Sequence, residues 1–241
     1  MRALSRLWML AARLRQRRMW PGPRAREELI RRHAPGRSFA DIGAMWNVNG
    51  RIAFVAEECG ATSVTAVDLM APTSAYETEH AERSSRVRFV QGDLHDGQVL
   101  EQVGEHEVVW CSGVLYHSPN PLLTLQRLRA ITTELLILST ETIPEVPGVA
   151  GACVFYPALS DADRRVHAMA RPGQQAVGID TPFDPGQSYM AWWWGISPSA
   201  LRGMLRASGF QILEEHGLPL HSTIVARTVL GQLSDAQVSK M

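Results

Sequence analysis

Short apolar segments rich in β-branched residues alternate with helical segments along residues 38–140, and this alternation constrains the fold more than any other feature. The apolar segments are nearly continuous, which is typical of parallel strands buried on both faces of a sheet. Helices are then expected on both sides of the sheet, because parallel strands need long crossover connections. The predicted strands cover residues 38–42, 63–68, 87–90, 107–112 and 134–140, and the helices between them cover residues 49–58, 73–84, 97–103 and 119–131.

The alternation stops after residue 143 and returns at residue 197. Residues 144–190 hold six prolines and five glycines, with one predicted helix over 160–169. A helix over 197–208 and a hairpin of residues 210–215 and 222–228 then complete the sheet. Because long loops in compact domains are usually functional, we interpret the irregular stretch as a substrate lid. The predicted segments are an arm (1–37), a cofactor-binding core (38–143), the lid (144–196), the C-terminal completion of the sheet (197–228) and a tail (229–241).

The arm carries most of the positive charge. Residues 1–37 contain eleven arginines and two acids, a net charge of +9, whereas the rest of the chain carries −9. Its apolar residues fall at helical spacing and form one stripe: Leu4, Leu7, Trp8, Ala11 and Leu14. Arginines follow where a signal peptide would have small residues and a cleavage site. Three interpretations remain: a helical cap on the chain's own body, attachment to a membrane surface, or contact with RNA.

The composition excludes several classes of protein. Three scattered cysteines do not form a disulfide framework, and no CxxC or HxxxH spacing indicates a metal site. The longest apolar runs are shorter than the roughly 18–20 residues that cross a bilayer. We therefore expect a reduced, cytoplasmic protein without a metal.

Acidic residues stand at the ends of the first three predicted strands. Asp41 and Gly43 close the first strand, Asp68 the second and Asp93 the third. Ligands of open α/β sheets bind at this edge, where Asp68 is placed to accept hydrogen bonds from ribose hydroxyls. Asp93 is placed to accept from an adenine amino group, with the ring between two leucines, Leu69 and Leu94. The turn after the first strand lacks GxGxxG, so a nucleoside without phosphates fits better than NAD or ATP.

Four motifs fall in a familiar order: DIG (41–43), VDLM (67–70), QGDL (91–94) and VVWCSGVLYH (108–117). In this order the chain resembles the class I S-adenosylmethionine-dependent methyltransferase family. The segments GVLYHSPNPLLTLQRL (113–128) and WWWGISPSALRGMLRASGF (192–210) resemble the branch with tRNA wobble-uridine carboxymethoxy methyltransferases and many small-molecule O-methyltransferases. The resemblance implies a Rossmann-like, seven-stranded, mostly parallel sheet with a C-terminal antiparallel hairpin and an N-terminal helical cap.

The resemblance also implies S-adenosylmethionine as cofactor and S-adenosylhomocysteine as product. In the wobble-uridine enzymes, use of a carboxylated cofactor goes together with lysines near the site. The body of this chain has no lysine there, so plain methyl transfer is expected. Carried over by position, the implied contacts are Asp41, Gly43 and Ala44 to the methionine moiety, Asp68 and Leu69 to ribose and adenine, Asp93 and Leu94 to adenine, and Cys111 and Ser112 beneath the sulfonium.

Candidates for the acceptor chemistry follow the fourth and fifth strands. His117 is the first candidate for a general base, and the alternative is that it hydrogen-bonds a loop backbone. Tyr116 is the second catalytic candidate, and it is expected to pack against the cofactor or hydrogen-bond near it rather than to act chemically. Glu141 is a candidate for orienting the substrate, with a helix-cap or surface role as the alternative, and His221 is expected to be structural. Tyr189, Trp192, Trp193 and Trp194 are candidates for lining an acceptor pocket, and the alternative is that they only cover the sheet edge.

Three functions agree with these features. The favoured one is O-methylation of a small molecule, such as a natural product or a glycan. The second is methylation of RNA, which the basic arm favours and the acidic body disfavours. The third is a non-catalytic, cofactor-binding or membrane-associated scaffold.

Overall fold

The computed structural model describes residues 2–19, 23–169, 171, 178–187, 189–218 and 220–229. Most of the predicted tail and parts of the predicted lid, namely 170, 172–177 and 188, lie outside these residues.

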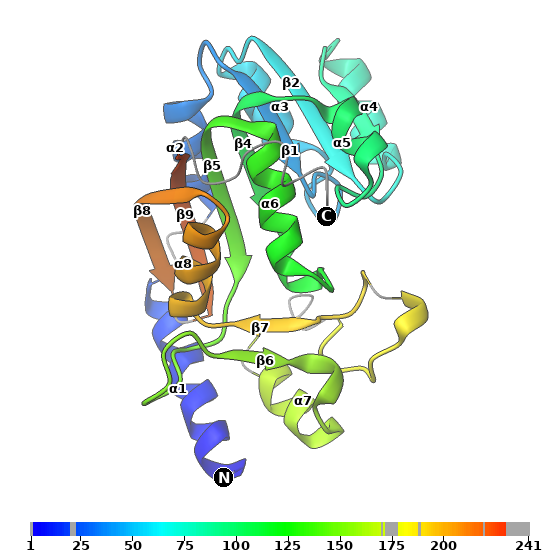
Figure 1. The fold of residues 1–241 in the computed structure, drawn as a ribbon. Coiled ribbons are helices and arrows are strands. Elements are labelled where there is room, and N and C mark those ends of the chain that lie inside the picture. The colour runs from blue at the N-terminus through cyan, green and yellow to red at the C-terminus, as the bar shows by residue number, and fades with distance from the viewer. Residues whose placement is uncertain are drawn as a thin grey trace.

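Seven strands form one sheet in the order β3-β2-β1-β4-β5-β9-β8 (Figure 1). They are β1 (Ser38–Ile42), β2 (Ser63–Asp68), β3 (Arg88–Gln91), β4 (His106–Ser112), β5 (Thr132–Glu141), β8 (Phe210–Leu218) and β9 (His221–Thr228). The first five are parallel, and β9 is antiparallel to both β5 and β8. This confirms the mostly parallel sheet with a C-terminal hairpin. The strand order reverses between β1 and β4, whose carboxyl ends flank the topological switch point.

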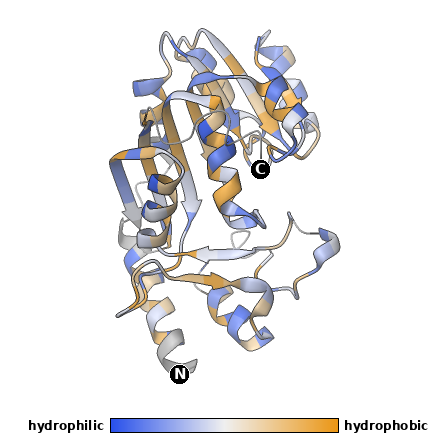
Figure 2. Ribbon diagram, in the orientation of Figure 1, coloured by the Kyte–Doolittle hydropathy of each residue, from blue (hydrophilic) through white to orange (hydrophobic). Residues whose placement is uncertain are grey.

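Helices cover both faces of the sheet. The described helices of the body are α2 (Pro23–His33), α3 (Arg51–Glu58), α4 (Ser74–Glu82), α5 (Gly97–Val103), α6 (Pro121–Ile131) and α8 (Pro198–Ala207). In Figure 1, α6 and α8 lie in front of the sheet, and α6 carries both hydrophobic and hydrophilic residues, as expected for a helix with one buried side (Figure 2).

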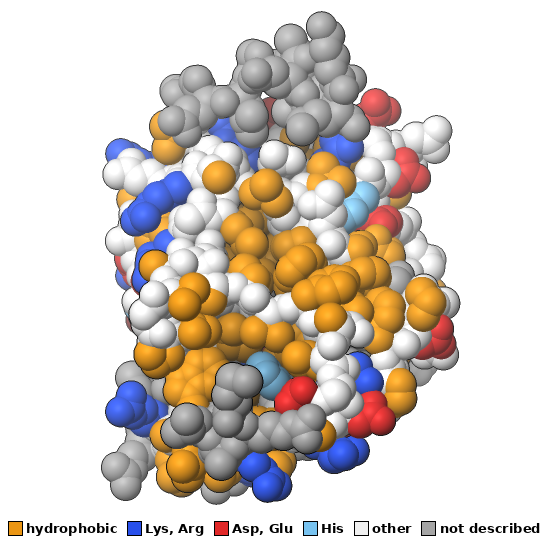
Figure 3. All heavy atoms as spheres, turned by 60° about the horizontal axis from the view of Figure 1, so that its bottom comes forward, with side chains coloured by type: hydrophobic (Ala, Val, Ile, Leu, Met, Phe, Trp, Pro, Cys, Tyr) orange, Lys and Arg blue, Asp and Glu red, His pale blue; other side chains and the backbone are white. Residues whose placement is uncertain are grey.

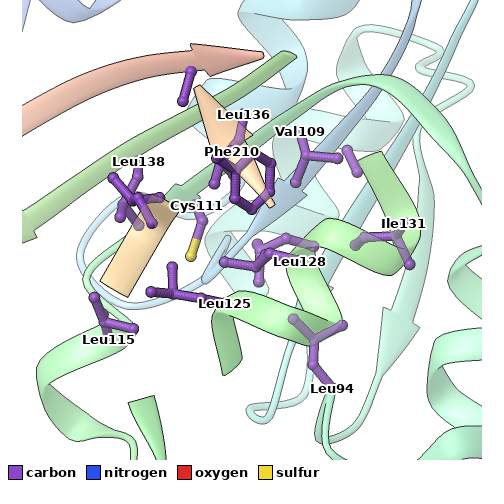
Figure 4. Packing of buried hydrophobic residues seen from close by; sticks show 14 of the residues in the cluster. Leu94, Val109, Cys111, Leu115, Leu125, Leu128, Ile131, Leu136, Leu138 and Phe210 are labelled. Atoms are coloured by element: carbon purple, nitrogen blue, oxygen red, sulfur yellow. The ribbon is translucent and has the colours of Figure 1, made fainter. Parts of the chain in front are cut away.

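The pleat of the strands divides the core into two clusters. In β4, Val108 and Trp110 pack with residues of α2 and α3, whereas Val109 and Cys111 pack with residues of α5, α6 and α8. Figure 4 shows the second cluster, in which Leu125, Leu128 and Ile131 of α6 lie beside Phe210 and the β4 and β5 side chains. Neighbouring strand residues therefore serve opposite faces of the sheet.

One helix start differs from the prediction. Asn49 does not cap α3: the N-cap is Gly50 at φ +76°, without a side-chain cap. Asn49 has a positive φ of 46°, and its Oδ1 accepts a hydrogen bond from Thr73 Oγ1 at 2.8 Å. The asparagine thus fixes the turn after β1 to the loop before α4.

A second, two-stranded sheet was not predicted. Its strands β6 (Cys153–Phe155) and β7 (Trp194–Ile196) are antiparallel and only three residues long, too short for a periodic signal. Together with α7 (Asp161–Met169), they lie beyond the edge toward which the arrows of β2 and β5 point (Figure 1). The irregular segment therefore stands opposite the carboxyl ends of the parallel strands.

Helix α1 (Arg2–Met19) packs on α7. Among the side chains described for residues 6–15, Met9 and Ala12 are buried, and they pack with Val166 and Leu220. Leu7 and Leu14, which the predicted apolar stripe contained, are exposed. The packed face is thus rotated relative to the predicted stripe and shares only Trp8 with it among the described side chains.

We expect Leu128→Ala to lower the free energy of unfolding by about 2–5 kcal/mol, because Leu128 is fully buried between α6 and the sheet. Leu122→Ala in the same helix is the matched control, since Leu122 is 39% exposed, and should change stability far less. Denaturant unfolding of both variants measures the difference. Equal losses would contradict the assignment of the α6 face.

Candidate functional site

A pocket of about 620 Å³ lies at the carboxyl ends of the parallel strands. One half is lined from the loops after β1, β2 and β3, and the other from the loop after β4, the end of β5 and the start of β9. Residues of the 144–196 segment, Tyr189, Met190 and Trp192, close it from outside. The pocket therefore spans the switch point, where open α/β sheets bind ligands.

The turn after β1 needs glycine at position 43. Gly43 has a φ of +85°, and a Cβ there would lie 2.5 Å from the Ser112 carbonyl oxygen and 2.7 Å from Val114 Cγ2. Its amide donates to the Val67 carbonyl at 2.9 Å. The backbones of the loops after β1 and β4 thus approach each other closely, and the pocket opens above them. Asn47 takes a left-handed φ of 58° in this turn, a conformation that asparagine tolerates better than most residues.

Asp68 joins two loops at the pocket wall. One carboxylate oxygen accepts from the Met45 amide at 2.7 Å, and the other accepts from the Met70 amide at 2.8 Å. The carboxylate lines the pocket beside Leu69, which is 43% exposed. Because a carboxylate can accept about four hydrogen bonds, Asp68 retains capacity for a ligand's hydroxyl groups.

Asp93 accepts from both sides. Its Oδ1 takes the His95 amide at 2.9 Å, and its Oδ2 takes the hydroxyl of Tyr189. Burial and the neighbouring carboxylate raise the pKa of Tyr189, so its hydroxyl stays protonated and donates a hydrogen bond to Asp93. Leu94 lines the pocket next to Asp93. The 144–196 segment therefore directly contacts the half of the pocket that is lined from the loops after β1, β2 and β3.

Three sequence-predicted residues, Asp41, Ala44 and Cys111, lie outside the pocket lining. All three are fully buried. Neither oxygen of Asp41 has a hydrogen-bond partner within normal geometry. Burial raises the pKa of Asp41 to about 8, an effect that the Ala53 amide of α3 only partly offsets and the Asp68 charge increases. Ser112, unlike Cys111, lines the pocket.

Tyr116 and His117 stand on the short 3₁₀ helix η1 (Leu115–His117) and line the pocket. His117 Nδ1 lies 2.9 Å from the Ala191 carbonyl, and the Trp193 amide donates to the Tyr116 carbonyl at 2.9 Å. Burial lowers the pKa of His117 to about 4, while the Ala191 contact acts in the opposite direction. A neutral imidazole that donates to a loop carbonyl fits the second of the two sequence interpretations, a backbone contact.

The three tryptophans point in different directions, as expected for an extended chain. Trp192 is buried and lines the pocket, with its ring centroid 4.2 Å from that of Tyr116. Trp193 contacts the Phe155 and Phe183 rings, and Trp194 Nε1 donates to the Pro119 carbonyl at 3.1 Å. Only Trp192 among them reaches the pocket, together with Tyr189 of the same segment.

The outer surface of this end of the molecule is apolar as well. Figure 3 turns the end that carries the β6–β7 unit toward the viewer, and hydrophobic side chains gather across its middle. Exposed apolar side chains of the described residues in this segment include Val149, Phe155 and Met190. Met190 is also part of the pocket wall, so it connects the outer surface with the pocket.

A polar cluster lies at the far end of the pocket, and the sequence interpretation named only Glu141 of it as a functional candidate. Ser139 and Glu141 alternate along β5 and therefore share a face, and Glu141 is the cross-strand partner of His221 in β9. His221 Nδ1 lies 3.2 Å from Glu141 Oε1, and its Nε2 lies 2.9 Å from Ser139 Oγ. All three residues line the pocket, as does Arg26 of α2. The i, i+2 spacing of Ser139 and Glu141 was visible in the sequence, but the pairing register with His221 was not.

Within the described part of the chain, no group of three His, Cys, Asp or Glu side chains is arranged to hold a metal ion. No helix among the same residues is long and apolar enough to cross a membrane.

Comparisons with known proteins agree with this geometry. A family model described as a methyltransferase domain matches residues 41–134. The 1,6-didemethyltoxoflavin-N1-methyltransferase of Burkholderia thailandensis, solved with 1,6-didemethyltoxoflavin and S-adenosylhomocysteine, has a TM-score of 0.58 at 17% identity, over 94% of this chain and 88% of that one. No match was found among curated protein sequences.

Two further structures are similar in fold. The N-terminal domain of EvdMO1 with S-adenosylhomocysteine has a TM-score of 0.58 at 16% identity, over 88% of this chain and 82% of that one. The magnesium protoporphyrin IX methyltransferase of Synechocystis PCC 6803 has a TM-score of 0.51 at 16% identity, over 84% of this chain and 83% of that one. These likenesses establish the class I methyltransferase fold. The family match adds that residues 41–134 are similar to a methyltransferase domain, and three of the solved relatives of this fold are methyltransferases or were solved with S-adenosylhomocysteine.

We expect Gly43→Ala to destabilise the protein and to abolish binding of S-adenosylhomocysteine, because the new methyl group would collide with the Ser112 carbonyl and Val114. Gly36→Ala is the matched control: Gly36 has a similar φ of +72°, but no atom lies within 4 Å of the position that a Cβ would take there. Thermal unfolding and ligand titration of both variants separate backbone strain from collision. Equal behaviour of the two would show that the close approach is unimportant.

Asp41→Asn should stabilise the protein more at pH 8 than at pH 5. The pKa of Asp41 is about 8 in the folded chain, against an ordinary value of 3.8. Between these values folding takes up a proton, so the wild-type free energy of unfolding falls as the pH rises, while asparagine does not titrate. Denaturant unfolding of both proteins at the two pH values measures the effect. A pH-independent difference would mean that Asp41 is already ionised in the folded chain at pH 5.

Proposed function

We propose that this methyltransferase transfers a methyl group from S-adenosylmethionine to an oxygen atom of a small molecule. The observation that carries the proposal is one pocket that joins Asp68 and Asp93 at one end to Ser139, Glu141 and His221 at the other. Its volume of about 620 Å³ is in the range of small-molecule sites.

The nucleoside half of the pocket suits the cofactor. We infer that Asp68 accepts from the ribose hydroxyls and Asp93 from the adenine amino group, with Leu69 and Leu94 against the ring. Asp93 already accepts a hydroxyl donor, Tyr189, inside the pocket, which supports its role as an acceptor. Two carboxylates without any lysine in the body suit an uncharged nucleoside better than a phosphate.

The methionine moiety would then lie over the turn that begins at Gly43, which packs against the Ser112 carbonyl because residue 43 has no side chain. Asp41 and Ala44 are fully buried on the core side of this turn, and Cys111, next to Ser112 in β4, is fully buried as well. The cofactor supplies a sulfonium methyl group that is already an activated electrophile. The protein's share of the work is to hold the acceptor in line with that methyl group and to exclude water.

The acceptor half has aromatic and polar walls. Tyr116 and Trp192 form its aromatic side, and Tyr116 and His117 fasten the 144–196 segment through backbone contacts. We infer that Tyr189 and Trp192 line the acceptor site, whereas Trp193 and Trp194 hold the segment together. One structural relative was solved with 1,6-didemethyltoxoflavin and another in the presence of D-fucose, which supports a small acceptor.

RNA is the weaker candidate. The 144–196 segment walls the pocket on its outer side, and the body beyond residue 37 carries a net charge of −9. A nucleic-acid partner calls for a basic footprint around the site.

Asp68→Ala should weaken binding of S-adenosylhomocysteine by about 1–3 kcal/mol, the cost of losing a charged hydrogen-bond acceptor. Asp96→Ala is the matched control, because Asp96 caps α5 outside the pocket and should leave the affinity unchanged. Isothermal titration calorimetry at a temperature where both variants are folded measures the affinities. Wild-type affinity in Asp68→Ala, or binding of NAD or ATP in place of S-adenosylhomocysteine, would contradict the proposed cofactor site.

A further inference from the structure

The cluster of Ser139, Glu141 and His221 has the geometry of a proton acceptor. Its three side chains form a hydrogen-bonded chain, Ser139 Oγ to His221 Nε2 at 2.9 Å and His221 Nδ1 to Glu141 Oε1 at 3.2 Å. All three are buried and line the pocket. These three hydrogen-bonded side chains lie outside the motifs proposed to hold the cofactor, and cofactor binding does not require them.

The direction of each hydrogen bond follows from the donors present. An ionised carboxylate only accepts, so the proton of a neutral His221 ring is on Nδ1 and points to Glu141. Nε2 then carries the lone pair and accepts the Ser139 hydroxyl proton. Ser139 Oγ lies 3.2 Å from Thr223 Oγ1, which is placed to donate to it in turn. His221 is therefore held as a base with its basic nitrogen directed toward the pocket side of Ser139.

Charged and titratable groups around the pair come from several elements. Arg171 Nε lies 3.5 Å from Glu141 Oε2, and its guanidinium lies 4.6 Å over the Trp192 ring. Arg26 of α2 lines the same end of the pocket, where burial lowers its pKa and Glu141 opposes that change. Tyr116 faces the cluster from η1, and burial raises its pKa, so its hydroxyl stays protonated.

The cluster also lies where a methyl acceptor is needed. Ser139 is the register partner of Ser112 on β4, and the Gly113 amide donates to the Ser139 carbonyl at 3.2 Å. Ser112 and Gly113 line the middle of the pocket, between the nucleoside half and the cluster. A group bound against Ser139 thus lies next to the end of β4, above which the sulfonium is proposed to lie.

We propose that His221 is the general base of this enzyme, positioned by Glu141, and that its acceptor substrate carries a hydroxyl group on an aromatic ring. This inference rests on the proposed function. The ring lies between the aromatic wall of Tyr116 and Trp192 and the polar cluster, with its hydroxyl against Ser139.

The proton and charge balance is simple. As the acceptor oxygen forms its bond to the methyl carbon, it gives its proton to Ser139 Oγ, which passes its own proton to His221 Nε2. The bond between sulfur and the methyl carbon breaks, and sulfur keeps that electron pair and becomes neutral. The positive charge ends on the His221 imidazolium, where Glu141 stabilises it.

The test compares His221→Asn, Glu141→Gln and the matched control His216→Asn in the full chain. Asparagine keeps a donor toward Glu141 but cannot take up the proton, and His216 is exposed on β8 outside the pocket. Transfer from S-adenosylmethionine to phenol, catechol and 2-naphthol is followed as S-adenosylhomocysteine formed, with anisole as the acceptor without a free hydroxyl. Calorimetry with S-adenosylhomocysteine is run on every variant.

We expect at least one of the three hydroxyl compounds to be methylated and anisole not to be. His221→Asn should lower the turnover about 100-fold or more, the usual share of a general base, with wild-type affinity for S-adenosylhomocysteine. Glu141→Gln should lower it by a smaller factor, and His216→Asn should leave it unchanged. Full turnover in His221→Asn, or no turnover on any hydroxyl compound while S-adenosylhomocysteine binds, overturns the inference. Failure of the wild type to bind S-adenosylhomocysteine would instead overturn the proposed function.

A second readout needs neither cofactor nor acceptor. NMR of the histidine ring nitrogens in the free protein should show His221 as the Nδ1–H tautomer, and Glu141→Gln should shift its Nδ1 proton resonance. An Nε2–H tautomer in the wild type would contradict the proposed direction of proton transfer.

Discussion

The contact between the loops after β1 and β4 is the constraint on which the rest of the site depends. Gly43 approaches the Ser112 carbonyl so closely that no side chain fits between them. This approach lets the turn after β1 pack against the end of β4, so that the carboxyl ends of β1, β2 and β4 lie side by side at the same edge of the sheet. Asp68 then fixes the turn by accepting the Met45 amide. A pocket at the switch point follows from backbone packing before any ligand is considered.

The pocket has two halves with different chemistry. The nucleoside half is built from loops that follow β1, β2 and β3, and its polar groups are carboxylates. The acceptor half is built from β4, β5 and β9, where the sheet changes from parallel to antiparallel. The antiparallel strand begins at the edge where the parallel strands end, so it places His221 directly beside Glu141. A fully parallel sheet would have no strand start at this position.

Much of the fold could be predicted from the sequence, because buried parallel strands leave a strong apolar signal and their ends carry turn residues. The acidic strand ends were found for the same reason, since Asp68 and Asp93 directly follow apolar segments. Local signals failed where the structure depends on distant partners. Asn49 is a residue type that often caps helices, but its side chain accepts a hydrogen bond from Thr73 instead. The three-residue strands β6 and β7 depend on pairing with each other. His221 was interpreted as structural because its pairing with Glu141 depends on the register of strands 80 residues apart.

The most direct test of the account is a crystal structure of the protein with S-adenosylhomocysteine. The Tyr189 hydroxyl donates to Oδ2 of Asp93, the carboxylate that is proposed to accept the adenine amino group. We predict the adenine ring between Leu69 and Leu94, the ribose on Asp68, and the Tyr189 hydroxyl displaced from Asp93 or sharing it with the base. A ligand bound outside this pocket, or within it with neither Asp68 nor Asp93 in contact, would contradict the account.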